Sequence, residues 1–417
     1  MPDNETFDAL VIGGGTVGAA AALALARTGR EVALIDRKQP EERPADAPLD
    51  PRVVAVSPGS KRLLEALGAW QHIRPARIAA YSDMQVVAGR GKVDFRATEH
   101  GLAALGWIAE LPELDQALWH ELNKRRRVSI HAPAEVGEIH AGTDEVSVKL
   151  ADGQTLAGRM LLGADGAKSR VRAAAGIDAT AHHYNQRAIV AHLETERPNP
   201  GTAWQRFSDL GPLALLPLPE GRLSRRLSRR LSRQSSRQSS LVWSVHDDEA
   251  ERLMALDDSE FLDTLAEHCV EPPFGAFTTA GERHALPLVR RQSKPLASGR
   301  IALIGDAARS VHPLAGQGLN LGLADVAALV EALDGWQGKD DPGDCLNRYA
   351  RRRWSDSVLV AGGIHAINET RTLGEIGKHA LGASFTAMRF ARPAREVFVR
   401  RACGLGEVKK AVGILTG

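Results

Sequence analysis

Short apolar runs recur along the chain, and each stops near a glycine or an aspartate. Such runs occupy residues 7–12, 31–35, 160–163 and 301–304. Runs of this length and composition predict buried strands of a parallel sheet. Elsewhere apolar residues return at helical spacing, as they do at Leu319, Leu323, Val326, Leu329, Val330 and Leu333. Strands that alternate with helices predict an α/β fold.

A second pattern covers two other parts of the chain. Residues 78–96 and most of residues 182–288 alternate between apolar and polar positions, which is typical of half-buried strands. We expect one helix in the second part, at residues 259–268, and two further strands within residues 128–150. Aromatic residues of the second part either line an apolar pocket or pack inside the sheet: Trp204, Phe207 and Trp243.

Length and composition indicate an ordinary globular protein. With 417 residues, 43% of them hydrophobic and 25% charged, the chain is long enough for two closely joined domains. The cysteines, Cys269, Cys345 and Cys403, are too far apart for a metal-binding spacing and indicate a reducing compartment. Acidic residues precede the apolar segment 10–26, whereas a signal peptide has a basic leader. We therefore expect a cytoplasmic protein without a membrane span.

Residues 222–240 form a low-complexity insert of only arginine, serine, leucine and glutamine. The formal net charge of +2 includes the insert's seven arginines, so the rest of the chain carries −5 and does not indicate a nucleic-acid partner. We interpret the insert as an expansion at the tip of a hairpin that runs from residues 219–221 to residues 241–244. The alternatives are a basic arm for anionic lipid and a phosphorylatable serine cluster.

A dinucleotide fingerprint follows the first predicted strand. Gly13, Gly15 and Gly18 have the spacing G-x-G-x-x-G between a strand and an alanine-rich helix, and Asp36 ends the second strand 23 residues after Gly13. The glycines allow a pyrophosphate to reach the helix N-terminus, and the carboxylate can accept hydrogen bonds from a ribose. A carboxylate would repel a 2′-phosphate, so FAD or NAD is favoured over NADP; Arg37 adjoins this position.

Two later segments repeat the arrangement of a strand followed by an aspartate. Asp165 and Gly166 follow the run at residues 160–163, and Asp306 follows the run at residues 301–304. A loop with Pro313 and several glycines then leads into a helix. Glycine allows the backbone to lie against a flat ligand, and a helix N-terminus favours negative charge. A flat ligand that becomes negatively charged when reduced is a flavin.

Residues 312–325, with the sequence His-Pro-Leu-Ala-Gly-Gln-Gly-Leu-Asn-Leu-Gly-Leu-Ala-Asp, resemble the flavin-loop motif of the ubiquinone-biosynthesis aromatic hydroxylases, members of the para-hydroxybenzoate hydroxylase group. The resemblance implies an α/β fold with a Rossmann-like FAD-binding domain, an interleaved β-sheet substrate domain and a helical C-terminal tail. The implied boundaries are 1–77, 111–180 and 291–357 for the FAD-binding domain, 78–110 and 181–290 for the substrate domain, and 358–417 for the tail.

The resemblance also implies roles for individual residues. Asp306 would bind the ribityl hydroxyls of FAD, while His312 and Pro313 would shape the substrate face of the flavin without acting as an acid or base. Arg52 would face the flavin; its alternative is a surface ion pair. Gln116 would contact the flavin; its alternative is a plain helix-surface position. The remaining implied FAD contacts are Asp165 and Gly166, and, in the flavin loop, Gly316, Gly318, Leu319 and Asn320.

The implied reaction is hydroxylation of the aromatic ring of a polyprenylated phenol. Because the chain carries one dinucleotide fingerprint, FAD would be bound permanently and NAD(P)H would visit transiently to reduce it. The reduced flavin would add O2 to form a C4a-hydroperoxide, from which the phenol takes an oxygen. Two rivals are a same-fold FAD oxidoreductase, such as an epoxidase or prenyl reductase, and a non-catalytic flavoprotein scaffold.

The resemblance places the protein in ubiquinone biosynthesis, at the inner-membrane surface or within an enzyme complex. Residues 371–410 contain nine lysines and arginines and three glutamates, with apolar residues interspersed. Such a segment is either a basic amphipathic tail that contacts a membrane surface or a packed helical tail with a solvated face. Near residue 370 the chain lacks the family's Leu-Phe-Ser or Leu-Phe-Asn element, which leaves the docking of substrate or partner open.

Overall fold

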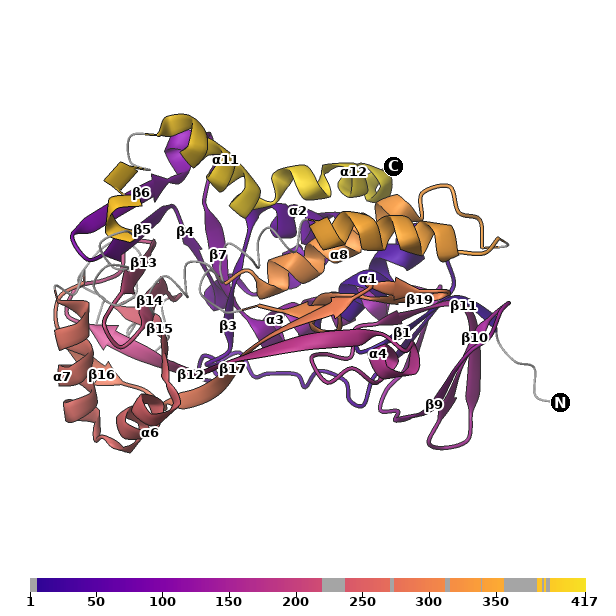
Figure 1. Ribbon diagram of the computed structural model, residues 1–417, viewed down its shortest axis with the longest axis horizontal. Helices are drawn as coiled ribbons and strands as arrows, with labels where there is room; N and C mark the ends of the chain where they lie inside the picture. The colour runs from indigo at the N-terminus through magenta and orange to yellow at the C-terminus, as the bar shows by residue number, and fades with distance from the viewer. Residues whose placement is uncertain are drawn as a thin grey trace.

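A computed structural model shows two large sheets joined into one elongated molecule (Figure 1). It describes residues 6–219, 237–270, 274–311, 316–338, 340–355, 381–384, 386–387 and 391–417. The first sheet and its helices form one end of the molecule. The second sheet and two helices that cover it, α6 (Asp247–Ala255) and α7 (Asp258–Cys269), form the other end (Figure 1).

The first sheet is built around parallel strands. Its strands are β1 (Thr6–Ile12), β2 (Val32–Ile35), β8 (Val128–His131), β9 (Val136–Ala141), β10 (Val146–Leu150), β11 (Thr155–Gly163), β18 (Ala297–Ser298) and β19 (Ile301–Leu303). The order across the sheet is β18-β19-β11-β1-β2-β8, and a β9–β10 hairpin joins through β11. Strands β19, β11, β1, β2 and β8 run parallel, so their carboxyl ends share one edge.

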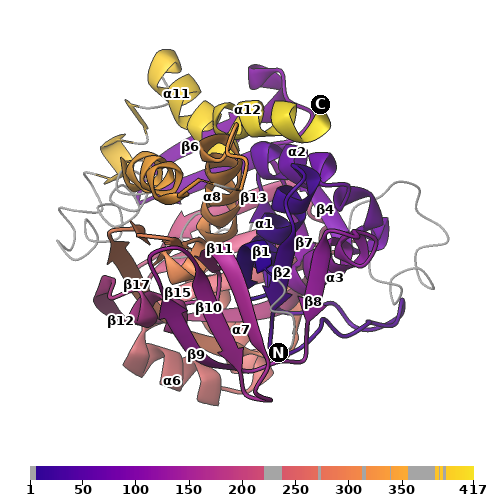
Figure 2. The same cartoon turned by 90° about the vertical axis from the view of Figure 1, so that its right-hand side faces the viewer.

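Helices cover this sheet and close its core. They are α1 (Thr16–Arg27), α2 (Pro58–Ala66), α3 (Leu111–Leu122), α4 (Arg170–Ala174) and α8 (Gly318–Ala332). Ten of the twelve residues of α1 are buried, and most of them are alanines, so α1 packs closely against both α3 and α8. Figure 2 shows α1 lying beside β1 at the centre of this unit. This close packing determines the position of the N-terminus of α1.

The second sheet contains long antiparallel strands. They are β5 (Asp83–Ala88), β6 (Gly91–Arg96), β12 (Asp178–Thr195), β13 (Thr202–Phe207), β14 (Pro212–Pro217), β15 (Gln238–His246), β16 (Phe277–Ala280), β17 (His284–Lys294) and β20 (Arg309–Ser310). The order is β20-β17-β12-β15-β14-β13-β5-β6, and β16 pairs with β12. A third, smaller sheet has the order β3-β7-β4 and comprises β3 (Val53–Val56), β4 (Ile78–Tyr81) and β7 (Gly106–Glu110).

The structure changes several details of the predicted elements. Residues 247–269 form two helices rather than one, because α6 has only Ala250 and Leu253 buried and so carries a weak apolar pattern. Residues 128–150 form three strands rather than two. The aromatic side chains Trp204, Phe207 and Trp243 are buried in core clusters and therefore pack inside the second sheet.

Strands on either side of the low-complexity insert form the expected hairpin. Strand β14 pairs antiparallel with β15, from Leu213 opposite Trp243 to Pro217 opposite Ser239. Most of the insert, residues 222–236, lies outside the described residues. The hairpin belongs to the second sheet, whereas the glycine fingerprint belongs to the first.

The C-terminal helices pack back onto the body of the protein. They are α11 (Arg392–Cys403) and α12 (Leu405–Thr416), and α12 lies against α2 and α8 (Figure 1). Val408, Ala411 and Leu415 are buried in the main core. A Cβ atom on Gly59 would lie 2.4 Å from the carbonyl oxygen of Gly404, so glycine allows α2 to meet the tail closely. None of the helices in the described part of the chain is long and apolar enough to cross a bilayer.

Candidate flavin-binding site

Three segments that are far apart in sequence meet at the carboxyl edge of the parallel sheet. Gly13 follows β1, Asp165 lies just beyond β11, and Asp306 lies just beyond β19. A Cβ atom on Gly13 would lie 2.3 Å from the carbonyl oxygen of Ala164, so the first and second segments touch. A Cβ atom on Gly305 would lie 3.2 Å from the Val17 side chain, so the third segment touches helix α1.

The glycine fingerprint leaves the N-terminus of α1 open. Gly15 is the N-cap residue and has no side chain that could cap the helix, and the first turn contains no acidic residue. A Cβ atom at Gly15 would meet nothing within 4 Å, whereas one at Gly18 would lie 1.8 Å from the carbonyl oxygen of Gly13. Gly18 therefore serves close packing, and Gly15 faces open space where the N–H groups of the first turn and the helix dipole favour an anion.

Asp36 lies at the end of β2, beside the glycine loop. Its carboxylate accepts hydrogen bonds from the backbone N–H groups of Gly14 and Lys38, the latter at 3.0 Å. These bonds orient the carboxylate next to the open helix N-terminus, where a ribose adjoining a pyrophosphate would lie. Arg37, the next residue, has an exposed side chain.

Asp165 builds the turn that follows β11. Its carboxylate accepts hydrogen bonds from the Ser169 hydroxyl and from the backbone N–H groups of Arg170, at 2.6 Å, and Val171, at 3.1 Å. The side chain therefore organises the start of α4. Gly166 has a left-handed φ of +80°, and a Cβ atom there would meet nothing within 4 Å, so the backbone rather than the carboxylate is the open surface of this turn.

Asp306 lies on the 3-10 turn η4 (Gly305–Ala307). Its side chain reaches solvent on one side while protein atoms surround the rest. Desolvation raises the pKa of this carboxyl above its usual value, and the charges of Arg309 and Arg291 partly offset that rise. The Arg172 guanidinium donates a 3.2 Å hydrogen bond to the carbonyl oxygen of Ala307 and so connects η4 to helix α4.

A buried carboxylate holds the Asp306 turn against helix α8. Asp325, which is fully buried, accepts a hydrogen bond of 3.0 Å from the backbone N–H of Gly305. The guanidinium of Arg309 also donates to it at 3.0 Å, and that of Arg353 at 2.7 Å. Both arginine side chains are almost completely buried. Since a single carboxylate binds two arginines and the turn, Asp325 determines where Asp306 is presented.

Asn320 fixes the start of α8 against strand β3 and helix α2. Its Oδ1 accepts hydrogen bonds from the backbone N–H of Ser57, at 2.9 Å, and the hydroxyl of Ser60, at 2.8 Å. Its Nδ2 donates to the carbonyl oxygens of Ala55, at 2.8 Å, and Gly316, at 3.2 Å. The amide therefore positions the flavin loop through protein contacts.

Other parts of the flavin loop are more open. A Cβ atom at Gly318 would meet nothing within 4 Å, and Leu319 is partly buried against the core. His312 and Pro313, predicted to shape the substrate face, lie outside the described residues.

Arg52 forms an ion pair with Asp50, the residue that begins its motif. Its Nε lies 3.0 Å from one carboxylate oxygen, and one terminal nitrogen lies 3.2 Å from the other. The bond to Asp50 raises the pKa of the Arg52 guanidinium. His192, on β12, lies with Nε2 3.0 Å from the carbonyl oxygen of Asp50, so this segment also contacts the second sheet.

Helix α3 presents Asp115, rather than Gln116, to the glycine fingerprint. The Asp115 carboxylate accepts a hydrogen bond from the Thr16 hydroxyl in the first turn of α1. Desolvation raises the pKa of this carboxyl to about 6, with a small further contribution from Asp36, although the hydrogen bonds from Thr16 and the charge of Arg52 partly counteract the rise. By contrast, the Gln116 amide donates to the carbonyl oxygen of Glu41 at the surface.

Trp119 lies one helical turn after Asp115 and supports the same loop. Its indole N–H donates a 2.7 Å hydrogen bond to the carbonyl oxygen of Gly14. Neither residue was singled out in the sequence. Their spacing of four residues, on the buried side of an amphipathic helix, was the available signal, because such residues share one face.

The geometry at this edge defines a class of protein. The N-terminus of α1, the carboxylate at the end of β2 and the aspartate turn after β19 lie along the carboxyl edge of one parallel sheet, where α/β proteins bind dinucleotides. The protein is thus an α/β protein of the dinucleotide-binding class.

Comparisons with known proteins agree with this class. Residues 6–356 match the family described as "FAD binding domain". The 3-demethoxyubiquinol 3-hydroxylase of Escherichia coli K12 is 31% identical over 87% of this chain and 89% of its own length. The mitochondrial ubiquinone biosynthesis monooxygenase COQ6 of Mus musculus is 34% identical over 81% of this chain and 78% of its own length. The chain belongs to the family of FAD-dependent hydroxylases of ubiquinone biosynthesis.

Solved structures confirm the predicted fold class. The p-nitrophenol 4-monooxygenase PnpA from Pseudomonas putida DLL-E4 superposes with a TM-score of 0.69 at 20% identity and covers 99% of both chains. PqsL from Pseudomonas aeruginosa, a probable FAD-dependent monooxygenase, superposes with a TM-score of 0.67 at 21% identity and covers 97% of this chain and 100% of its own. The prediction of a para-hydroxybenzoate hydroxylase-like fold is therefore correct.

Proposed function

We propose that this protein hydroxylates the aromatic ring of a polyprenylated phenol in ubiquinone biosynthesis, with FAD as the bound cofactor, NAD(P)H as a transient reductant and O2 as co-substrate. The observation that carries the proposal is the meeting of the Gly13, Asp165 and Asp306 segments at one sheet edge. Two relatives support the chemistry, because one is named a 3-demethoxyubiquinol 3-hydroxylase and the other a ubiquinone biosynthesis monooxygenase.

The residues at this edge fit FAD. The open space in front of Gly15 suits a pyrophosphate, since a Cβ there would meet nothing within 4 Å. Asp36 would hold the adenosine ribose and Asp306 the ribityl hydroxyls. Bound FAD supplies the redox chemistry, taking electrons from NAD(P)H and activating O2. The proposed cofactor contacts are Gly13, Gly15, Asp36, Arg37, Arg52, Asp165, Gly166, Asp306, Gly316, Gly318, Leu319 and Asn320. Gly18 serves close packing instead, and Gln116 donates to the carbonyl oxygen of Glu41.

The chain's own contribution is positioning and electrostatics. The N-terminus of α8 begins at Gly318 without a side-chain cap, so its free N–H groups favour negative charge by about 0.3–1 kcal/mol when exposed. Asn320 holds the start of α8 against Ser57, and Asp325 holds the backbone of Gly305 against α8. His312 and Pro313 would shape the face on which the phenol lies, and the second sheet would cover the substrate and exclude water.

We also propose that the C-terminal region contacts an anionic membrane surface. Helix α11 carries Arg400 and Arg401 beside the exposed apolar side chains of Val397, which is 65% exposed, and Phe398, which is 48% exposed. Apolar and basic groups on one helix suit an interface where lipid tails meet anionic headgroups. A prenylated substrate resides in such a membrane, and association with a ubiquinone-biosynthesis complex would serve the same delivery.

The test is reconstitution followed by product analysis. Purified protein is incubated with FAD, NAD(P)H, O2 and a synthetic prenylphenol, and the product is measured by mass spectrometry. We expect a yellow protein and one added oxygen on the ring. Two added hydrogens would instead identify a reductase, and NAD(P)H oxidation without any product would favour a scaffold. A protein that stays colourless after FAD addition refutes the proposal. Intermediate profiling in a deletion strain then identifies the ring position.

A further inference from the structure

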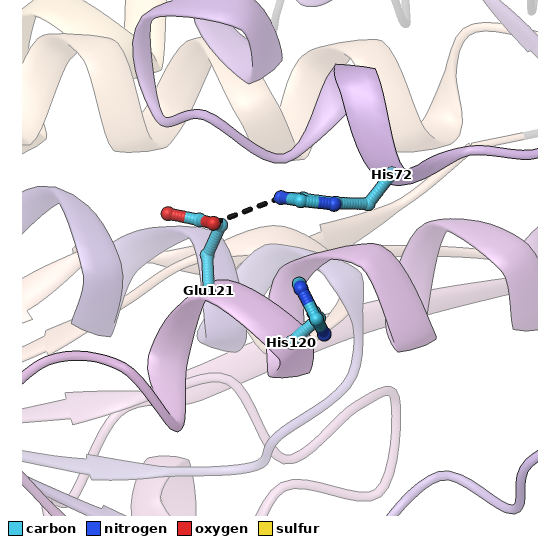
Figure 3. A group of neighbouring side chains, drawn as sticks. All are labelled: His72, His120 and Glu121. Carbon is cyan, nitrogen blue, oxygen red and sulfur yellow. Dashed lines mark hydrogen bonds and ion pairs between the residues drawn. The ribbon is translucent and has the colours of Figure 1, made fainter.

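Two histidines and a glutamate meet on the side of α3 away from the glycine loop. His72 ends the 3-10 turn η1 (Trp70–His72), while His120 and Glu121 lie in the last turn of α3. Figure 3 shows the His72 ring pointing towards Glu121, with the His120 ring rising from the same helix next to it. The His72 Nε2 lies 2.9 Å from a Glu121 carboxylate oxygen, and the two imidazole centroids are 4.2 Å apart.

The donor atoms of this cluster match those of an open zinc site. Two imidazole nitrogens and one carboxylate oxygen leave a fourth position for water, and a tetrahedral site with bonds of 2.0–2.2 Å needs donors about 3.3 Å apart. The donor atoms of His72, His120 and Glu121 all lie within 4.8 Å of one another. His120 is exposed, so its side chain is free to close the remaining gap.

The Glu121 carboxylate is the buried member of this cluster. The Glu121 side chain is only 7% exposed, whereas Lys124 and Arg125, which also contact it, are more exposed. Lys124 lies 3.0 Å from one oxygen and Arg125 lies 3.1 Å from the other. A bound cation would compete with both side chains for the Glu121 carboxylate. Lys124 is 51% exposed, so its ammonium group can move into solvent more easily than the Arg125 guanidinium can.

We propose that His72, His120 and Glu121 form a binding site for a divalent transition-metal ion, with zinc as the best match to these donors. The ion would join η1 to the end of α3. Because α3 also carries Asp115 and Trp119, which hold the glycine fingerprint, the ion would stabilise the element against which the cofactor loop rests. This role is independent of the proposed hydroxylation.

The test is titration of the full-length, tag-free protein with zinc chloride after treatment with a chelator. Isothermal titration calorimetry and the melting temperature are the readouts. We expect one zinc ion per chain and a higher melting temperature with zinc than with magnesium, which prefers oxygen ligands. The variants His120→Asn and His72→Asn should each weaken zinc binding by about tenfold or more. Loss of a group that only hydrogen-bonds to a metal ligand typically lowers metal affinity by about 10–100-fold, and loss of the ligand itself should cost at least as much.

Two further variants make the result specific. Lys124→Met removes a competing cation and should tighten zinc binding, a change opposite in sign to that of the histidine variants. His140→Asn is the matched control, because His140 lies beside Glu138 at 3.4 Å on an exposed hairpin and belongs to no described triad. Zinc binding that is absent, or that His120→Asn and His72→Asn leave unchanged, refutes the site. Melting temperatures without zinc establish that each variant is folded.

Discussion

Replacement of Asp325 by asparagine tests whether a buried charge holds the Asp306 turn. Asparagine has the same shape and keeps an oxygen that can accept from the Gly305 N–H. It removes the negative charge that Arg309 and Arg353 share, and their side chains are 2% and 1% exposed. The Arg309 guanidinium would then lose its buried ion-pair partner, while Arg353 would keep the Glu407 carboxylate, which lies 3.9 Å away.

The expected loss is large for one isosteric change. Removal of one partner of a buried ion pair costs about 3–5 kcal/mol, and whole domains are stable by about 5–15 kcal/mol. The entropy of unfolding grows with chain length, so for 417 residues each kcal/mol corresponds to roughly 1 °C, and the melting temperature should fall by about 3–6 °C. Since the backbone of Gly305 donates to Asp325 at 3.0 Å, displacement of the turn should also weaken FAD retention.

Differential scanning calorimetry and FAD fluorescence on dilution measure the two effects. Asp334→Asn is the control, because Asp334 is 49% exposed and lies 3.7 Å from Lys410 in a surface ion pair. Such pairs contribute about 0–1 kcal/mol, so the control should melt within about 1 °C of the parent protein. If Asp325→Asn melted as the control does and retained FAD, the inferred role of the buried charge would be wrong.

Four further changes address the glycine fingerprint and the helix that supports it. Gly15→Ala should leave the FAD-free protein folded but weaken FAD binding by about tenfold or more, whereas Gly18→Ala should lower the melting temperature even without FAD, because its Cβ would lie 1.8 Å from a carbonyl oxygen. Equal effects of both changes on the FAD-free melting temperature would contradict this assignment. The pKa of Asp115 is raised to about 6 in the folded protein, so ionisation of this carboxyl destabilises the fold as the pH rises from about 4 through 6. Asp115→Asn should therefore stabilise the FAD-free protein at pH 8 by up to about 3 kcal/mol. The same variant should have little effect at pH 4. A stability difference that does not change with pH would refute it. Trp119→Phe removes the 2.7 Å bond to the loop and should cost about 1–3 kcal/mol in chemical denaturation; an unchanged midpoint would show that the bond contributes little.

Local signals in the sequence were enough to predict the fold class and the cofactor. The fingerprint glycines, the aspartates after buried strands and the motif at residues 312–325 each occupy one short stretch of chain. Strand, turn and helix N-terminus are determined by neighbouring residues, so such motifs are readable without coordinates. Their meeting at one sheet edge then follows from the parallel order of β19, β11, β1 and β2.

Side-chain partners from distant segments were decided by tertiary structure alone. Asp115, rather than the predicted Gln116, meets the glycine fingerprint because of how α3 is rotated against α1. Asp325, on α8, reaches Arg353 only because the helical residues 343–355 pack beside α8. His72 meets His120 because the turn η1 packs against the end of α3. Periodicity records which face of an element is apolar, whereas the partner across that face depends on long-range packing.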